Sequence, residues 1–298
     1  MIKIVMLGST ASVPTKKHVP SCFAVQADKA YLFDACEGVQ RQLMKYNVSY
    51  SKVKSVFLSH LHADHFLGLF GLVQTLNMST RAEELLVFGP KGSGKFLETL
   101  FSTNELKPNF KVKVKEVSGT EKKPVFETDV FEVRAFQVKH GKNALGYVFK
   151  EKDKRRFDKK KAVKAGIKGR LFTEIGKKGV LKIGKKTVKY EEVTFVQMGK
   201  KIVYTGDTAF FSGLEKHFEN ANAVIADSTF LHEHKDLAKE KEHCTAFQIA
   251  KTCKKAQVKK LVLTHFSNRY DDRTPLLVEA KKEFKESALS EEGLELEI

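Results

Sequence analysis

The chain has 298 residues, of which 42% are hydrophobic and 30% are charged, so it holds enough apolar material for a folded core and is not disordered throughout. No apolar run approaches the roughly 18 residues that a membrane-spanning helix needs, which excludes a spanning segment. Lys and Arg outnumber Asp and Glu by 53 to 36, a formal net charge of +17. The four cysteines form no Cys-x-x-Cys pair and are too few for a disulfide framework, so we expect buried thiols in a protein of the reducing cytoplasm.

The chain begins with a short apolar stretch that lacks the length and the cleavage site of a signal peptide and instead predicts a first β-strand. Short runs rich in Val, Ile, Leu and Phe predict strands at Ile2–Leu7, Cys22–Ala27, Ala30–Phe33, Ser55–Ser59, Leu85–Phe88, Val130–Phe136, Leu145–Phe149, Thr194–Gln197, Ile202–Thr205, Ala223–Ala226 and Leu261–Thr264. The predicted helices are Gly38–Tyr46, Phe66–Asn77, Ser93–Phe101, Ala246–Ala256 and Pro275–Lys285. This order predicts one α/β domain over residues 1–298, with two sheets face to face and helices outside.

Two features interrupt this pattern in the second half of the chain. The stretch Gln197–Lys201 joins two predicted strands and is typical of a hairpin turn. Residues 150–189 hold 17 basic and 4 acidic residues, a net charge of +13, and match neither a core strand nor a long buried helix. We therefore expect this segment to be an inserted, projecting arm. Its charge suits a nucleic acid, although a solvated lysine-rich surface without a partner stays open at this point.

The clearest chemical signal is the segment Ser59–His65, which reads Ser-His-Leu-His-Ala-Asp-His. It follows a predicted strand and opens a helix-like segment, so three imidazoles and a carboxylate gather on one loop. His60 and His62 alternate along an extended chain and therefore point the same way. Imidazole and carboxylate are ligands that zinc prefers, so the segment predicts a metal site.

Four ligands cannot fill a two-metal site, so further ligands are expected at other strand ends. Three residues qualify: His140 follows the apolar stretch Val130–Val138, Asp207 follows Ile202–Thr205, and His265 follows Leu261–Thr264. A cleft at one edge of a two-sheet sandwich would bring such strand ends together.

The Ser59–His65 motif with these later residues resembles the metallo-β-lactamase superfamily. Longer matches narrow the resemblance to ribonuclease Z, the transfer-RNA 3′-processing endonuclease; they are Leu32–Gln40, Ser59–Leu72, Tyr204–Thr208, His243–Ala246 and His265–Tyr270. Phe157–Ala162 is similar to the start of the flexible arm of that family, which grips the tRNA body. The resemblance implies an αββα sandwich with an inserted basic arm at 150–189, and an endonuclease that removes the 3′ trailer from precursor tRNA. The products would be a tRNA 3′-hydroxyl and a 5′-phosphorylated trailer.

The resemblance also implies roles for single residues. Two zinc ions per subunit would be held by His60, His62 and His140 on one side, by Asp64, His65 and His265 on the other, and by Asp207 as a bridge. Asp34 would orient ligand imidazoles. From this ligand set and His243 we further expect Asp64 to accept a proton from the attacking water and His243 to donate one to the leaving oxygen. Ser267 and Arg269 would contact a substrate phosphate. The tRNA contacts of the arm would come from Lys154, Arg155, Arg156, Lys159, Lys160, Lys161 and Arg170, reaching tRNA bound at the partner subunit of a homodimer.

The chain departs from the usual pattern of the family at three places. It has His18-Val19 where Arg-Asn is frequent, Ile167–Arg170 in place of a Pro-rich stretch of the arm, and Asp227 where Glu is common. Two other interpretations remain open: a hydrolase of the same fold acting on a small phosphodiester or thioester, and a non-catalytic RNA-binding protein with structural zinc. The basic segment and Arg269 speak against the first, and the lack of a Cys-rich ligand set speaks against the second.

Overall fold

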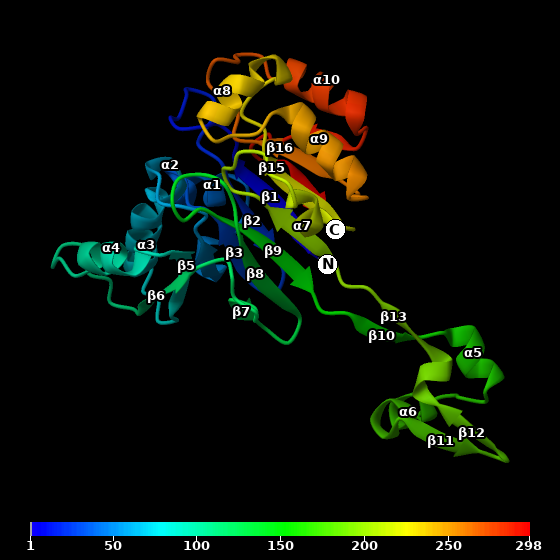
Figure 1. Cartoon of the computed structure of the whole chain (residues 1–298). Coiled ribbons are helices and arrows are strands. Elements are labelled where there is room, and N and C mark those ends of the chain that lie inside the picture. Colours follow the sequence, from blue (N-terminus) through cyan, green and yellow to red (C-terminus); the bar gives the residue numbers. More distant parts are fainter. Residues whose placement is uncertain (1) are drawn as a thin grey trace.

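The computed structural model describes residues 2–298 and consists of two seven-stranded sheets that pack face to face (Figure 1). In spatial order, the first sheet contains β18 (Glu295–Glu297), β1 (Lys3–Gly8), β2 (Cys22–Gln26), β3 (Ala30–Phe33), β4 (Val53–Phe57), β5 (Leu85–Pro90) and β6 (Val112–Val117). The second contains β17 (Ser287–Leu289), β16 (Leu261–Thr264), β15 (Ala223–Asp227), β14 (Lys201–Tyr204), β9 (Leu145–Glu151), β8 (Phe131–Gln137) and β7 (Phe126–Glu127). Strands β3 to β6 are parallel to one another, and so are β14 to β17.

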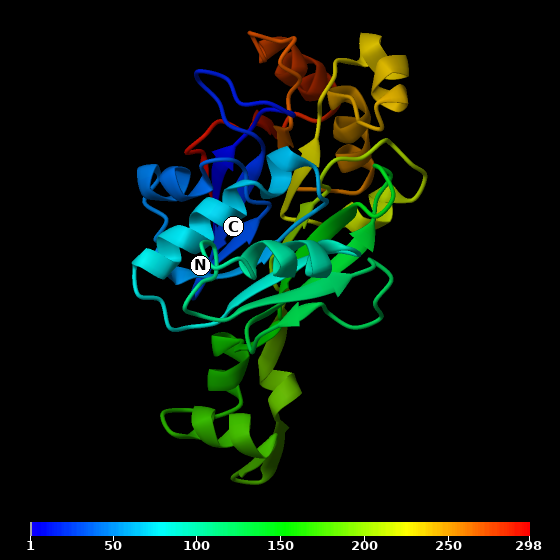
Figure 2. The same ribbon diagram turned by 90° about the vertical axis from the view of Figure 1, so that its left-hand side faces the viewer.

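Helices cover the outer face of each sheet. The first sheet packs against α1 (Val39–Lys45), α3 (Gly68–Met78) and α4 (Ser93–Phe101), which Figure 2 shows from outside. The second sheet packs against α7 (Leu214–Phe218), α9 (Ala246–Lys255) and α10 (Thr274–Glu283). The remaining short elements of the sandwich are α2 (Ala63–Phe66), α8 (Lys235–Glu240) and the 3₁₀ turns η1 (Tyr50–Lys52) and η3 (His232–His234). The layers run helix, sheet, sheet, helix, so the predicted αββα sandwich is confirmed.

An aromatic row fills the space between the sheets. Phe23, Phe33, Phe57 and Phe88 come from the neighbouring strands β2 to β5 and stack in turn, with ring centroids 4.9, 5.1 and 4.9 Å apart. Burial of each ring stabilises the fold by about 1.5–3 kcal/mol, and each stacked pair adds about 0.5–1.5 kcal/mol. Phe57 is the last residue of β4, so this packing fixes the point from which the Ser59–His65 loop starts.

Most predicted elements are present, with ends shifted by a few residues, and the four cysteines are free and buried as expected. The hairpin predicted at Gln197–Lys201 is wrong, because Thr194–Gln197 (β13) pairs with β10 (Lys154–Phe157) while β14 pairs with β9. The chain therefore continues from β13 into β14 alongside the segment that joins β9 to β10. Only glycine fits at position 199 on this path, because a Cβ there would lie 1.8 Å from the carbonyl oxygen of Glu151. Among residues 2–298 no helix has both the length and the apolar character to cross a bilayer.

A separate module projects from the sandwich between β9 and β14, and we call residues 154–197 the arm (Figures 1 and 2). The paired strands β10 and β13 form its stalk, and its tip holds α5 (Lys159–Lys164), α6 (Leu171–Lys178), β11 (Val180–Ile183), β12 (Lys186–Lys189) and η2 (Tyr190–Val193). The tip has a small core of its own: Ala162, Ile167, Ile175, Leu181, Val188 and Val193. The segment predicted over 150–189 is therefore the main part of the arm, which continues through β13.

Candidate metal centre

The Ser59–His65 loop places four polar side chains at the carboxyl end of β4. His62 is extended (φ −72°, ψ 144°) and precedes α2, whose first turn carries Asp64 and His65. The backbone N–H of His65 donates to the carbonyl of His62 at 3.0 Å, which closes this turn. His60, Asp64 and His65 are buried, whereas His62 is exposed. A strand that ends in a tight helical turn thus collects all four groups on one side.

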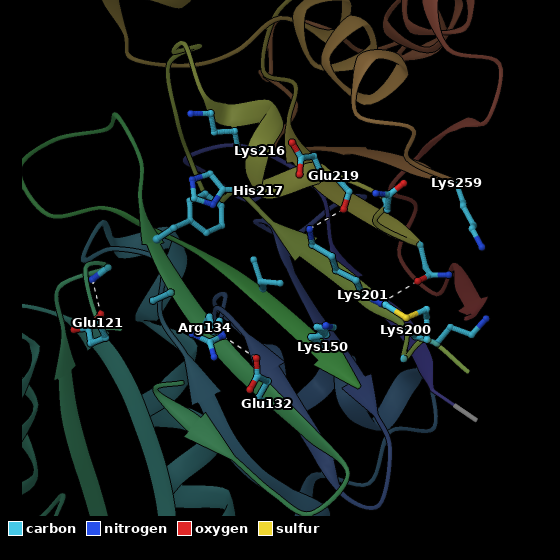
Figure 3. A pocket seen from close by; sticks show the side chains of 18 of the residues that line it. Glu121, Glu132, Arg134, Lys150, Lys200, Lys201, Lys216, His217, Glu219 and Lys259 are labelled. Carbon is cyan, nitrogen blue, oxygen red and sulfur yellow. Dashed lines mark hydrogen bonds and ion pairs between the residues drawn. The ribbon is translucent and has the colours of Figure 1, made fainter. Parts of the chain in front are cut away.

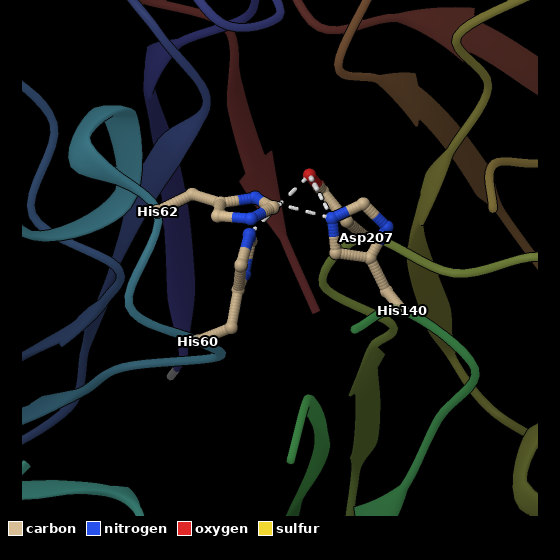
Figure 4. Close-up of side chains that lie close together, drawn as sticks. All are labelled: His60, His62, His140 and Asp207. Carbon is tan, nitrogen blue, oxygen red and sulfur yellow. Dashed lines mark hydrogen bonds and ion pairs between the residues drawn. The ribbon is translucent and has the colours of Figure 1, made fainter. Parts of the chain in front are cut away.

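One cluster joins this loop to both sheets. His60 and His62 come from the loop after β4, His140 from the loop after β8, and Asp207 from the loop after β14 (Figure 4). One potential ligand atom from each of the four lies within 4.8 Å of the others. His140 and Asp207, which the sequence places after strands, therefore lie beside the Ser59–His65 loop.

A second cluster contains Asp64, His65 and His265, whose ligand atoms also lie within 4.8 Å of one another. Asp207 Oδ2 lies 3.3 Å from His65 Nε2 and 3.1 Å from His265 Nε2. The same oxygen lies 3.7 Å from His60 Nε2 and 3.9 Å from His140 Nε2 in the first cluster. One carboxylate oxygen therefore stands between the two sets of imidazoles, as a bridging ligand would.

Asp34, which follows β3, holds two of these imidazoles in place through hydrogen bonds. It is fully buried, and its carboxylate accepts hydrogen bonds from His65 Nδ1 at 2.7 Å, Ser59 N at 2.6 Å, Ser59 Oγ at 2.7 Å and the Tyr204 hydroxyl at 2.6 Å. Because Ser59 Oγ donates to Asp34, it is free to accept from His60 Nδ1 at 3.0 Å. Asp34 thus orients one imidazole directly and a second through Ser59, which is the support that metal-ligating histidines commonly have.

The two remaining buried imidazoles are held in the same manner. His140 Nδ1 donates to the carbonyl of Glu242 at 3.0 Å. His265 Nδ1 donates to Thr229 Oγ1 at 3.0 Å, because that hydroxyl uses its own proton to bond Asp227. In the neutral form of each ring the proton on Nδ1 makes this bond, so Nε2 then carries the lone pair that a metal ion needs.

The Nε2 atoms of His60, His65 and His265 are buried and have no hydrogen-bond partner among residues 2–298. Their contacts with carboxylate oxygens meet the distance of an ion pair but not the geometry of a hydrogen bond. Leaving buried polar atoms unpaired costs about 1–3 kcal/mol each. Three such atoms facing shared carboxylates, all nitrogen and oxygen donors without sulfur, fit a pair of divalent cations such as zinc.

The protonation of the cluster follows its charges. Burial lowers the pKa of His60 well below its usual value, and the neighbouring His65 adds to this shift. Burial also opposes a charge on His65, but the carboxylates of Asp207 and Asp34 raise its pKa well above the usual value. Burial would raise the pKa of Asp207, yet the imidazoles of His265 and His65 beside it hold this pKa well below its usual range. Asp207 is therefore ionised at neutral pH, in the form that binds metal.

His243 lies beside the two clusters without belonging to either set of predicted ligands. Its ring centroid is 4.9 Å from that of His140 and 5.1 Å from that of His265. Its Nδ1 donates to Asp227 Oδ2 at 2.8 Å. Burial lowers the pKa of His243, but the charge of Asp227 and this hydrogen bond raise it further, to about 9. His243 is thus positioned to be protonated at neutral pH.

Asp227 ends β15, is fully buried, and occupies the position where the resembled family commonly has Glu. Besides His243, its carboxylate accepts from Thr208 N at 3.0 Å, Thr229 N at 3.0 Å and Thr229 Oγ1 at 2.6 Å. One of its carboxylate oxygens also lies within 4.8 Å of a potential ligand atom on each of Asp207, His243 and His265. These four hydrogen bonds engage both oxygens, two at each, and one of them holds His243 Nδ1.

A hollow of about 430 Å³ opens over the clusters. Besides the clustered residues and His243, its lining includes Ser12, Phe230, Lys241, Ser267 and Arg269. The Arg269 guanidinium lies over the Phe230 ring, 5.1 Å from its centroid. The Ser12 N–H donates to Asp64 Oδ2 at 2.9 Å, with Ser12 in the left-handed region at φ 57°. The structure thus brings Ser267 and Arg269 to the rim of the cluster, together with Lys241.

Sequence reasoning missed several residues that support the site: Ser59, Thr229, Lys241 and the carbonyl of Glu242. It also noted Asp227 only as a departure from a family pattern. Asp227 directly ends a predicted strand, so the same strand-end signal that indicated Asp207 could have indicated it. Nothing local in the sequence indicates that Thr229 or Glu242 would face a ligand.

A larger hollow, of about 1140 Å³, lies away from these clusters on the outer face of β8, β9 and β14 (Figure 3). Its carboxylates are already engaged or scattered: Glu132 pairs with Arg134 at 2.7 Å, and Glu121 accepts from Ser118 and Gly119 backbone N–H groups at 2.7 and 2.9 Å. Of its residues, His217 is the single histidine, stacked 3.9 Å from the Phe136 ring. Size alone does not identify the chemical site, whereas the convergence of ligands does.

Comparisons with known proteins agree with this geometry. A profile of the Beta-lactamase superfamily domain matches residues 29–157 and 178–266, and the gap falls inside the arm. Ribonuclease Z of Methanosarcina acetivorans is 37% identical over 305 residues, covering 100% of this chain and 98% of its own length. Ribonuclease Z of Pyrococcus horikoshii is 37% identical over 294 residues, covering 97% and 91%. The crystal structure of human tRNase Z, short form, has a TM-score of 0.72 at 24% identity and covers 99% of each chain.

Proposed function

The chain belongs to the ribonuclease Z family of the metallo-β-lactamase superfamily and is a tRNA 3′-processing endonuclease, and from that premise we propose how its own residues bind and cut precursor tRNA. The reaction removes the 3′ trailer and leaves a 3′-hydroxyl on the tRNA and a 5′-phosphate on the trailer. The observation that carries the assignment to this site is the convergence of seven His and Asp side chains, three of them with buried and unpartnered Nε2 atoms.

Two zinc ions would be held by His60, His62 and His140 on one side and by Asp64, His65 and His265 on the other, with Asp207 contacting both. Such a pair of ions polarises the phosphodiester and lowers the pKa of water, so that hydroxide is available near neutral pH. The hydrogen bonds of the Nδ1 atoms support this assignment, because they fix the tautomer of each buried imidazole before any ion binds.

Asp64 and His243 would move the protons. Asp64 lines the hollow, and its Oδ2 accepts from Ser12 N and lies 3.4 Å from His65 Nε2 and 3.6 Å from His265 Nε2, so a water held at this cluster would lie beside its carboxylate. His243, protonated through its contact with Asp227, would donate a proton to the departing ribose 3′ oxygen. A positioned general acid contributes about 10²–10⁴-fold to the rate. Asp227 is one methylene shorter than Glu, yet it reaches His243 at 2.8 Å, which supports retention of this role.

Ser267 and Arg269 would bind a phosphate on the tRNA side of the cut. Both line the same hollow as His243, and the Ser267 hydroxyl accepts from the backbone N–H of Arg269 at 3.4 Å. The Arg269 guanidinium, stacked over Phe230, keeps its edge available for phosphate oxygens, which it can bind in a bidentate manner.

The arm would bind the body of the tRNA. Arg155, Arg156, Lys159, Lys160, Lys161 and Arg170 are exposed, and Lys154 is half-buried. Within the arm, ion pairs in the described structure engage only Lys154, Lys161 and Lys178, so most of its positive charge is available. Folded RNA is recognised largely through its phosphates and 2′-hydroxyls, which suits such a surface.

The arm leaves the sandwich at the end opposite to the metal centre. Strand β9 begins at Leu145, whose N–H donates to the Ser59 carbonyl, and runs away from the centre to the stalk. Strand β14 returns from the stalk and leads to Asp207. This separation supports a homodimer in which the arm holds tRNA that is cut at the partner subunit. The four free cysteines are consistent with action in the reducing cytoplasm.

The decisive experiment is incubation of the purified protein with an unprocessed tRNA and mapping of both new ends, with metal content measured by elemental analysis. Cleavage at the 3′ end of the tRNA with two zinc ions per subunit is the expected result. Hydrolysis of bis(p-nitrophenyl) phosphate or a thioester without cleavage of precursor tRNA would instead support the small-substrate hydrolase.

A further inference from the structure

A second hollow opens on the metal centre from another side. It has a volume of about 210 Å³, and its lining includes His60, His62, Lys91, His140, Lys142 and Asn143. Of the described residues, only His62 and His140 also line the 430 Å³ hollow that contains His243 and Arg269. The two hollows therefore meet at the His62–His140 pair, whose nitrogen atoms lie 3.2 Å apart.

The second hollow carries two lysines and no acidic residue. Lys91 follows β5, and Lys142 lies in the loop between β8 and β9. Both are exposed and neither forms an ion pair among residues 2–298. Two carboxylates bond backbone groups next to these lysines: Glu116 accepts from Gly92 N at 2.9 Å, and Glu242 accepts from Gly141 N at 2.6 Å. Neither carboxylate forms an ion pair with Lys91 or Lys142 among residues 2–298, so both ammonium groups are left for an outside anion.

An endonuclease must hold a strand that continues on both sides of the cut. The tRNA side is accounted for by the hollow that contains His243, Ser267 and Arg269, so the trailer has to leave the centre in another direction. The second hollow begins at the ligands of one cluster, and its size is below the roughly 300–1,000 Å³ of ordinary ligand pockets. That size suits the backbone of one unpaired strand.

We propose that Lys91 and Lys142 bind the phosphate that follows the scissile one, between the first and second nucleotides of the 3′ trailer. The inference rests on the proposed function and adds a trailer subsite to it. A trailer of one nucleotide has no such phosphate, so the subsite recognises trailers of two nucleotides or more. Asn143, an uncharged neighbour in the same hollow, is placed to contact the adjoining sugar or base.

The test compares precursor tRNAs with trailers of one, two and six nucleotides, cut by the wild type, by the double variant K91Q/K142Q and by the control K95Q/K107Q. The control removes the same charge at two exposed lysines outside both hollows. We expect the double variant to lower kcat/KM about fivefold to twentyfold for the longer trailers and less than twofold for the single nucleotide. Its dependence of log kcat/KM on log salt should be shallower by about 0.7 per lost phosphate contact.

A neutral methylphosphonate at the first internal linkage of the trailer makes the test specific for that phosphate. It should slow the wild type by about the same factor as K91Q/K142Q and should have no further effect on the double variant. Equal sensitivity of both proteins to the methylphosphonate, or a double variant that behaves like K95Q/K107Q, overturns the subsite. If the wild type cuts no precursor tRNA at all, the proposed function fails instead, so the two failures are distinguishable.

Discussion

The metal centre and the arm handle charge in opposite ways. At the centre, carboxylates and imidazoles are buried, and almost every polar atom outside the cation positions has a partner at a fixed distance, as Asp34 and Asp227 illustrate. In the arm, basic side chains stand in solvent over a separate small core, and few of them are paired. Burial fixes geometry, which chemistry needs, whereas exposure keeps charge available to a large polyanion over a long range.

The two regions also lie at opposite ends of the same strands. Tyr147 and Tyr204 pair near the centre, and Lys150 and Lys201 pair near the stalk, so β9 and β14 connect one region with the other. In the proposed function, the sheet between them would separate the cutting of tRNA from the holding of its body. Changes at the centre should therefore alter kcat and metal content, and changes in the arm should alter tRNA affinity and its dependence on salt.

The largest effect is expected from Asp207→Ala. Because one oxygen of Asp207 lies within 3.9 Å of four imidazoles from both clusters, its loss should remove bound metal and lower turnover of precursor tRNA by about 10⁴-fold or more. Elemental analysis and single-turnover cleavage measure the two effects. The exposed Asp129→Ala is the matched control. A D207A protein that kept both ions and most of its turnover would remove Asp207 from the centre.

His243→Ala should separate proton transfer from metal binding. His243 is outside the predicted ligand sets, so the variant should keep its metal and its tRNA affinity while kcat falls by about 10²–10⁴-fold. The half-exposed His234→Ala, which changes the same residue type outside the hollow, serves as control. Turnover equal to that of the wild type would mean that another group protonates the leaving oxygen.

Removal of the arm should have a smaller effect and a different signature. Phe157 pairs with Thr194, so residues 158–193 can be replaced by an Asn-Gly turn that closes the stalk as a hairpin. We expect the Kd for tRNA to rise about 10- to 100-fold and its salt dependence to become shallower. Hydrolysis of bis(p-nitrophenyl) phosphate and metal content are the internal controls. An equal loss of both activities would show that the arm stabilises the sandwich instead of holding RNA.

The sequence was most informative where chemistry is local. Ser59–His65 carries four groups on one loop, and His140, Asp207 and His265 each follow a recognisable apolar strand, so their convergence could be predicted from the rule that such strand ends meet at one edge. The αββα layers followed from the same strands. The family resemblance supplied the roles that spacing alone leaves open, including those of Asp34 and His243.

Other features depend on contacts between distant segments and could not be predicted. Tyr204 reaches Asp34 from the opposite sheet, 170 residues away, and the carbonyl of Glu242 holds His140 from 102 residues away. Gly199 resembled a turn residue, yet its role is to let β13–β14 pass close to Glu151. The short helices of the arm bury only a few apolar residues among many lysines, so their pattern is too weak to identify them in advance.

The smallest effect is expected from Asp227→Asn, which should lower the pH at which turnover begins to fall. A general acid must be protonated, so turnover should fall as pH rises through the pKa of His243, about 9 in the wild type. Asp227→Asn removes the charge that offsets burial, so the pKa of His243 should drop and the fall should begin at lower pH. The loss in kcat should be several-fold to tenfold near pH 8.5 and smaller near pH 6.5, measured as a pH profile of single-turnover cleavage. Asp227→Glu, which restores a carboxylate, should recover the profile, and His243→Ala should lack this limb in either background. If Asp227→Asn leaves the pH profile unchanged, Asp227 does not control the pKa of His243. The electrostatic field at His243 then comes from the metal centre as a whole and not from this one ion pair.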